Sequence, residues 1–170
     1  MEPEAWSALI AVLAVSWTVW ANTTEWKRGR LLKGIELIEA YCKEFDSEPF
    51  RERRKAAAIY LLNEARNNAD PPADLCNILD FLEGIGFVHG KKLIEAEAVW
   101  HSFASWLLPY SVATTAVVAK LRERDPTLYE DFLSLCRAVE VIEAKRHPSN
   151  SSLHLTSPAY VKRFLKDEAR

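Results

Sequence analysis

The chain has 170 residues, of which 49% are hydrophobic and 27% charged, and a net charge of −2. This size suits one domain with accessory segments, and the charge gives no basis for a strongly basic nucleic-acid-binding domain. Only five glycines are present, whereas residues that favour helices dominate. The sequence therefore predicts an all-α protein, and its three widely spaced cysteines predict free thiols rather than a disulfide framework.

The first element is a run without charge. Residues 5–24 contain no Asp, Glu, Lys or Arg. As a helix they would span about 30 Å, the thickness of a bilayer's hydrocarbon core. Tryptophans, which favour the headgroup level, lie toward its two ends: Trp6, Trp17, Trp20 and Trp26. We expect a transmembrane anchor over residues 1–25.

The flanks of this run predict its orientation. No Lys or Arg precedes it, whereas Lys27, Arg28, Arg30 and Lys33 follow it. Because basic residues next to a span stay in the cytoplasm, the N-terminus is expected outside and the rest inside. The protein would then be a single-pass protein of the inner (cytoplasmic) membrane, with these four side chains facing lipid headgroups.

Two alternatives remain for the same run. A cleavable signal peptide would use Val19-Trp20-Ala21 as a cleavage site, but its expected basic start is replaced by Glu2 and Glu4. A buried helix of a soluble bundle would normally carry a polar stripe, which this run lacks.

A stripe of small residues follows one face of the expected span. Its spacing is 4, 3, 4, 3, and small residues at such spacing let two membrane helices approach closely. The stripe predicts a docking face for another transmembrane helix, although frequent alanine produces such patterns by chance. Its members are Ser7, Ala11, Ala14, Thr18 and Ala21.

The span is expected to continue as a helix through residues 26–45, because an apolar seam recurs there at helical spacing. That seam consists of Leu31, Ile35, Ile38, Cys42 and Phe45. A second helix is predicted over residues 49–68. A third is predicted to follow the cap Asp70, with Pro71 in its first turn. Its core positions are Leu75, Ile78, Leu79, Leu82 and Ile85.

Three more helices and a tail complete the expected bundle. Residues 93–108 form a helix that Pro109 ends or kinks, and residues 110–124 form the next. The sixth helix, residues 126–146, is predicted to start at Pro126 with Asp125 as its cap. Residues 149–158 read as a flexible linker. The basic, amphipathic tail 159–170 would offer Tyr160, Phe164 and Leu165 as a contact patch.

No catalytic, nucleotide-binding or haem motif occurs, and we expect no cofactor and no metal. Glu97 and His101, four residues apart, lack the further ligands of a bundle metal site. The sequence thus gives little reason to expect an enzyme. The alternative requires a polar pocket, for which the candidates are Glu83, His101, Trp106 and Arg122.

Residues 56–139 resemble a bacterial family known as domain of unknown function 4760. The resemblance is carried by "LDFLEGIG", then "LIEAE", a helix pair containing Trp and Pro, and "LRERDPTLYEDFLSL". It implies a helical domain behind one transmembrane helix, without an activity to transfer. Glu83, Trp106 and Arg122 lie at its more distinctive positions and are expected to anchor helix ends or crossings.

These features predict a membrane anchor (1–25), a cytoplasmic helical bundle (26–146), and a linker with a short tail (147–170). The leading hypothesis is an accessory protein that docks onto a membrane complex or self-associates, with lipids as further partners and no nucleic acid. Two alternatives stay open: a membrane-tethered ligand-binding or enzymatic bundle, and a soluble helical oligomer.

Overall fold

The structure, a computed structural model, describes residues 17, 20, 25, 28–63, 70–147 and 154–170. Within these ranges the regular secondary structure is helical and no strand occurs, which confirms the all-α prediction. An N-terminal helix is described continuously over residues 28–45. Six helices follow: α2 (Glu48–Asn63), α3 (Ala73–Gly90), α4 (Ala96–Ala113), α5 (Thr115–Arg122), α6 (Glu130–Arg146) and α7 (Pro158–Glu168).

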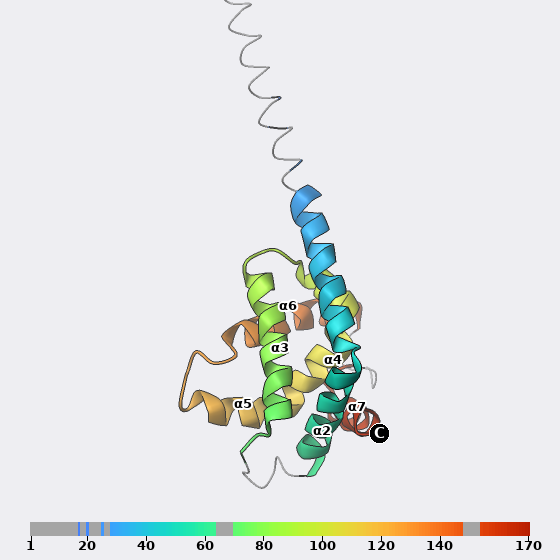
Figure 1. Ribbon diagram of the computed structural model, residues 1–170, viewed down its shortest axis with the longest axis vertical. Helices are drawn as coiled ribbons and strands as arrows, with labels where there is room; N and C mark the ends of the chain where they lie inside the picture. Colours follow the sequence, from blue (N-terminus) through green and yellow to red (C-terminus); the bar gives the residue numbers. More distant parts are fainter. Residues whose placement is uncertain (1–16, 18–19, 21–24, 26–27, 64–69, 148–153) are drawn as a thin grey trace, which may run out of the picture.

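The helices pack around one main hydrophobic core. Helix α6 packs against both α3 and α4, while α2 packs against both α3 and α7. The N-terminal helix runs alongside the bundle and extends past one end of it (Figure 1). The loop between α3 and α4 lies at that same end, and the C-terminus lies toward the other (Figure 1).

The predicted core of the third helix is confirmed, since its five core positions are all fully buried: Leu75, Ile78, Leu79, Leu82 and Ile85. Aromatic rings extend this core toward the N-terminal helix. The ring of Phe45 lies 5.6 Å from Phe81 and 5.6 Å from Phe103, centroid to centroid. Such aromatic pairs add stability beyond the area that they bury.

The predicted start of α3 was wrong. Asp70 does not cap the helix; Pro72 occupies the cap position with φ −67° and ψ 156°, and α3 begins at Ala73. The reason is that a residue before proline is pushed out of the helical region, so Pro71 cannot be helical. Asp70 instead pairs with Lys120 of α5, with 3.4 Å between Oδ1 and Nζ.

Pro109 does not end the fourth helix, because α4 continues through it to Ala113. The break comes at Thr114, where α4 and α5 meet at 62°. The hydroxyls of Thr114 and Thr115 donate to the carbonyls of Tyr110 and Ser111, at 2.7 and 2.9 Å. Bonds of this kind to the carbonyl four residues back bend helices.

The sixth helix also starts later than predicted. Asp125 accepts hydrogen bonds from the amide and hydroxyl of Thr127, but these close a turn rather than a helix. Tyr129 then adopts a left-handed conformation with φ 59°, and α6 begins at Glu130. A tyrosine in this conformation interrupts any helix that begins at Pro126.

The C-terminal tail is part of the bundle. Ser157 caps α7 by accepting from the amide of Tyr160. The predicted contact patch on this helix is largely occupied within the chain: Leu165 is buried, and Phe164 packs edge-on against Tyr110. Of the predicted linker, the described residue His154 is buried as well.

Among the described residues, no single helix is both long and apolar enough to cross a membrane. The bent pair of α4 and α5 meets the criteria of length and composition together. The anchor expected over residues 1–25, with its small-residue stripe, lies outside the described residues except at Trp17, Trp20 and Glu25. Trp6, Trp26 and Lys27 lie outside them too.

Candidate functional site

The apolar seam of the N-terminal helix is covered at one end only. Phe45 is buried and Ile38 is half-buried. Leu31 and Ile35, members of the same seam, are 62% and 48% exposed. The reason is that the bundle stops short of the first turns of this helix. The apolar face at Leu31 and Ile35 is therefore only partly covered by the described chain.

The loop between α3 and α4 approaches this open face at Gly34. A Cβ built on Gly34 would lie 2.7 Å from the carbonyl oxygen of Leu93, closer than real side chains come. Only glycine therefore permits this contact between helix and loop.

The loop has a defined conformation. The amides of Lys92 and Leu93 donate to the carbonyls of His89 and Val88, at 2.7 and 3.1 Å. Lys92 adopts φ 58°, a left-handed conformation usual for glycine where a helix ends. The ring Nδ1 of His89 donates to the carbonyl of Ile94 at 3.0 Å. These bonds fix the loop beside the helix.

Helix and loop enclose a half-open cavity of about 560 Å³, which we call the helix–loop groove. It is mainly apolar, with two acidic and two basic side chains among its lining. The lining residues are Arg30, Leu31, Gly34, Ile35, Ile38, Glu39, Lys92, Leu93, Ile94, Glu95 and Ala98.

A second hollow adjoins the groove on the side nearer residue 25. Its lining combines Arg30 and Lys33 of the helix with Lys91 and Lys92 of the loop, and Glu25 is its one acidic lining residue. We call these four basic residues the basic rim. The Nζ of Lys91 also lies 5.1 Å from the ring centroid of Phe87. The rim therefore joins two segments separated by more than fifty residues.

Exposed apolar side chains gather at this end of the molecule. Most of the exposed large apolar side chains among the described residues precede the N-terminal helix or belong to it, to the end of α3 or to the α3–α4 loop: Trp17, Trp20, Leu31, Leu32, Ile35, Phe87 and Leu93. The rest are Ile59, Val112 and Val141, which belong to three different helices. A local concentration of exposed apolar residues is typical of an interaction surface, whereas isolated ones are ordinary.

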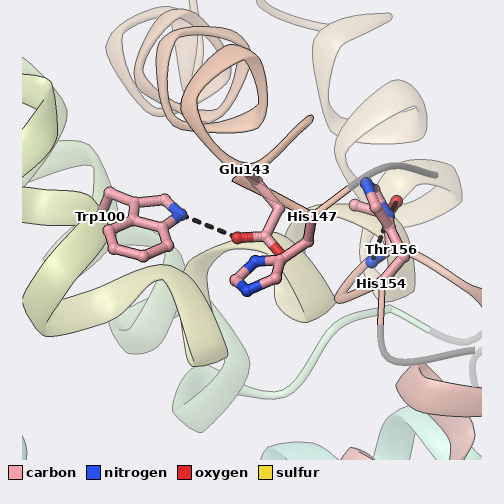
Figure 2. A network of polar contacts seen from close by, with 5 residues as sticks. All are labelled: Trp100, Glu143, His147, His154 and Thr156. Carbon is pink, nitrogen blue, oxygen red and sulfur yellow. Dashed lines mark hydrogen bonds and ion pairs between the residues drawn. The ribbon is translucent and has the colours of Figure 1, made fainter. Parts of the chain in front are cut away.

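A separate polar cluster joins α4 to α6. The buried carboxylate of Glu143 accepts a hydrogen bond from Trp100 Nε1 at 2.8 Å and lies 3.2 Å from Nδ1 of His147 (Figure 2). Arg146 pairs with Glu97 and stacks over the ring of Trp100. His154 and Thr156 bond to each other, apart from this group (Figure 2). Since these contacts tie two helices together, we assign the cluster a structural role.

The four residues considered for a polar pocket contact different partners. Glu83 accepts from the amides of Asp131 and Phe132 at the start of α6. Arg122 donates to the carbonyl of Leu128, and Trp106 to Glu168 of α7. His101 lies exposed on α4 beside the ring of Trp100. The polar contacts of Glu83, Arg122 and Trp106 thus hold helix ends and helix crossings in three different places.

No group of three or more His, Cys, Asp or Glu side chains suited to a metal ion occurs in the part of the chain that the structure describes. Cys42, Cys76 and Cys136 are free, in agreement with the prediction of unpaired thiols. Burial raises the pKa of the Cys136 thiol to about 12, so this side chain stays protonated near neutral pH.

Sequence reasoning identified only one side of the helix–loop groove. Arg28, Arg30 and Lys33 were expected at a headgroup surface, and all three are exposed. Lys91 and Lys92 were interpreted merely as the end of one helix and Leu93 as the start of the next, which in the structure begins at Ala96. The available signal for the loop side of the site was the order Gly90, Lys91, Lys92, Leu93, in which two lysines stand between a glycine and an apolar residue.

Comparisons with protein families, curated proteins and solved structures give no match to this chain. The resemblance to domain of unknown function 4760 therefore stays a prediction, and the candidate site stands on its own geometry.

Proposed function

We propose that this protein is a membrane-anchored accessory protein whose helical bundle lies against the cytoplasmic face of the inner membrane. Its span and bundle dock onto a membrane protein complex or onto a second copy. Anchoring confines both partners to two dimensions, so weak contacts gain effective concentration.

One observation supports this proposal above the others. Exposed apolar residues and the basic rim gather at the end of the bundle where the chain arrives from the uncharged run 5–24. Leu31, Leu32 and Ile35 face outward there, although a helix in water would normally bury them. A lipid surface or another membrane protein would give these residues apolar surroundings.

Membrane fractionation of the full chain tests the anchor. We expect the protein in the pellet and resistant to high salt and alkaline carbonate. The double variant L9R/L13R should move into the supernatant, because an arginine inside a span is costly, by about 3 kcal/mol at its centre. The matched variant L31R/L32R, outside the span, should stay in the pellet. Wild-type protein in the supernatant would refute the proposal and favour a soluble oligomer.

Topology is tested with a membrane-impermeant thiol reagent on intact cells. Cys42 and Cys76 are partly exposed and lie after the expected span. They should react only after the membrane is permeabilised. Reaction in intact cells would place the bundle outside and contradict the proposal.

Purification in a mild detergent tests the accessory role. We expect the tagged full chain to carry one membrane protein in fixed stoichiometry or to elute as an oligomer. A monomer that retains a small molecule would instead support the ligand-binding alternative.

A further inference from the structure

We infer that the α3–α4 loop is a second, peripheral membrane contact that inserts Leu93 among anionic lipid headgroups while Lys91 and Lys92 bind their phosphates. This inference rests on the proposed function, because it needs the anchor to hold the bundle at the bilayer. It adds a contact from a segment remote in sequence, and it makes the bilayer the occupant of the hollow that the basic rim lines.

The short distance between the loop and the expected membrane surface supports the inference. The hollow that contains Lys91, Lys92 and Leu93 is lined on the helix side by Glu25, Gly29, Arg30 and Lys33. On the expectation that the span continues as a helix, a rise of about 1.5 Å per residue places the residues that line this hollow within about 12 Å of Glu25, and Glu25 directly follows the uncharged run. The loop therefore lies within about a Debye length or slightly more of the headgroups, where basic side chains are attracted.

The charges of the site vary with distance from the span. Along the chain, Glu25 is followed by the three described basic residues Arg28, Arg30 and Lys33, and then by the acidic Glu36 and Glu39. On the loop, the basic Lys91 and Lys92 come before Glu95, which lines the helix–loop groove but not the hollow of the basic rim. Except for Glu25, positive charge thus lies nearer the expected bilayer than negative charge does, which complements an anionic lipid surface.

The apolar side chain at the loop tip agrees with this placement. Leu93 is 39% exposed and lies in the same hollow as the basic rim, and Phe87 nearby is 52% exposed. Lysine stems can lie along apolar surface while their ammonium groups reach phosphate. Lys92 holds a left-handed conformation that glycine would adopt at lower cost, so the position carries a charge where backbone geometry alone favours glycine.

The test places an environment-sensitive fluorophore on the full-length protein reconstituted in vesicles. The background variant is C42A/C76A, which leaves only the buried Cys136. One protein carries L93C at the loop, and the control carries I59C, an exposed position on α2. Vesicles contain phosphatidylcholine alone or phosphatidylcholine with phosphatidylglycerol.

We expect a blue-shifted, brighter signal at position 93 with phosphatidylglycerol, a smaller change with phosphatidylcholine alone, and no change at position 59. K91E/K92E should abolish the response at position 93 without releasing the protein from the vesicles. If each lysine contributes about 1 kcal/mol, the lipid-bound population of the loop should fall at least tenfold. Free phosphate at the same pH should leave the signal at position 93 unchanged in the protein that retains Lys91 and Lys92.

Flotation of the vesicles after carbonate washing separates the two proposals. Anchored protein whose signal at position 93 matches that at position 59 would refute the loop contact and leave the anchor intact. Equal signals in the two lipid mixtures would refute the role of anionic lipid. Protein that fails to float would refute the anchor and, with it, this inference.

Discussion

The guanidinium of Arg54 on α2 faces the carboxylate of Glu168 on α7, with Nε and Oε2 3.2 Å apart. Both side chains are largely buried. Arg54 also stacks on the ring of Phe45 at 4.1 Å, but its Nε and Nη1 have no hydrogen bond of good geometry. Glu168 is therefore the charge that compensates a buried arginine, and it fastens the last helix to the bundle.

Removal of that compensating charge should destabilise the protein. We expect Glu168→Ala to lower the free energy of unfolding by about 3 kcal/mol, because it leaves a buried cation unpaired. Urea unfolding followed by tryptophan fluorescence measures this, since Trp106 Nε1 also donates to Glu168.

The double variant R54M/E168M is the matched control for this pair. Apolar side chains of similar length should restore most of the lost stability, because no buried charge remains. A double variant as unstable as Glu168→Ala would contradict the role assigned to the charge pair.

Two glycines of α3 should respond oppositely to alanine. A Cβ on Gly86 would lie 2.5 Å from the backbone carbonyl of Asp131, whereas a Cβ on Gly84 meets only Tyr41 Oη at 3.7 Å. We expect Gly86→Ala to cost about 2 kcal/mol by forcing α3 and α6 apart. Gly84→Ala should gain up to about 1 kcal/mol from helix propensity. Equal effects in urea unfolding would show that the close crossing at Gly86 is not required.

Glu83 should act as a cap for a helix other than its own. Its Oε2 accepts from the amide of Phe132 at 2.6 Å and its Oε1 from that of Asp131 at 3.3 Å. Helix α6 has no side-chain cap at Tyr129, so Glu83 supplies these acceptors and a negative charge at the helix start. We expect Glu83→Ala to cost about 2 kcal/mol and Glu83→Gln about half as much.

Hydrogen exchange distinguishes this role from general packing. The amides of Phe132 and Asp131 should lose protection in Glu83→Ala more than amides in the middle of α6. Uniform loss of protection along α6 would argue against capping.

Stability should fall at alkaline pH, in part through Cys136. Burial raises the pKa of this thiol from about 9 to about 12 in the folded chain. Between these values the unfolded chain releases the proton and the folded chain retains it. Deprotonation then stabilises the unfolded state relative to the folded state, and the free energy of unfolding falls by up to about 1.4 kcal/mol per pH unit.

The variant C136S isolates this contribution, because serine does not titrate in that range. Urea unfolding at several pH values from 8 to 11 should show a shallower decline for C136S than for wild type. Parallel declines would assign the alkaline loss to other groups, of which Tyr129, its pKa raised mainly by burial, is the first to test.

Local patterns predicted the existence of the helices better than their ends. The apolar spacing of α3 identified its core because it repeats over several turns. The helix ends were predicted wrongly because the effect of an end signal depends on its neighbours. Pro72 overrides the cap predicted at Asp70, and the left-handed Tyr129 overrides the start predicted at Asp125. The helix break predicted at Pro109 occurs instead at Thr114, whose hydroxyl bonds to the carbonyl of Tyr110.

The candidate site was half predictable for a related reason. Arg30 and Lys33 follow an uncharged run, which is a local pattern. Lys91 and Lys92 join them only because Gly34 admits the loop against the helix, and that contact depends on tertiary packing. The buried pair of Arg54 and Glu168, more than a hundred residues apart, was likewise invisible to helical spacing.

Helix α7 follows the other described helices in the chain, and this order has a consequence for biosynthesis. Its residues leave the ribosome after those of the other described helices, so these helices are made before Glu168 can meet Arg54. A product cut short before residue 158 would lack this helix. It would expose Ala58, Tyr110 and the unpaired guanidinium of Arg54, which are buried when α7 is present. Cellular proteases, which act on exposed and loosely folded chains, should therefore remove truncated copies faster than complete ones.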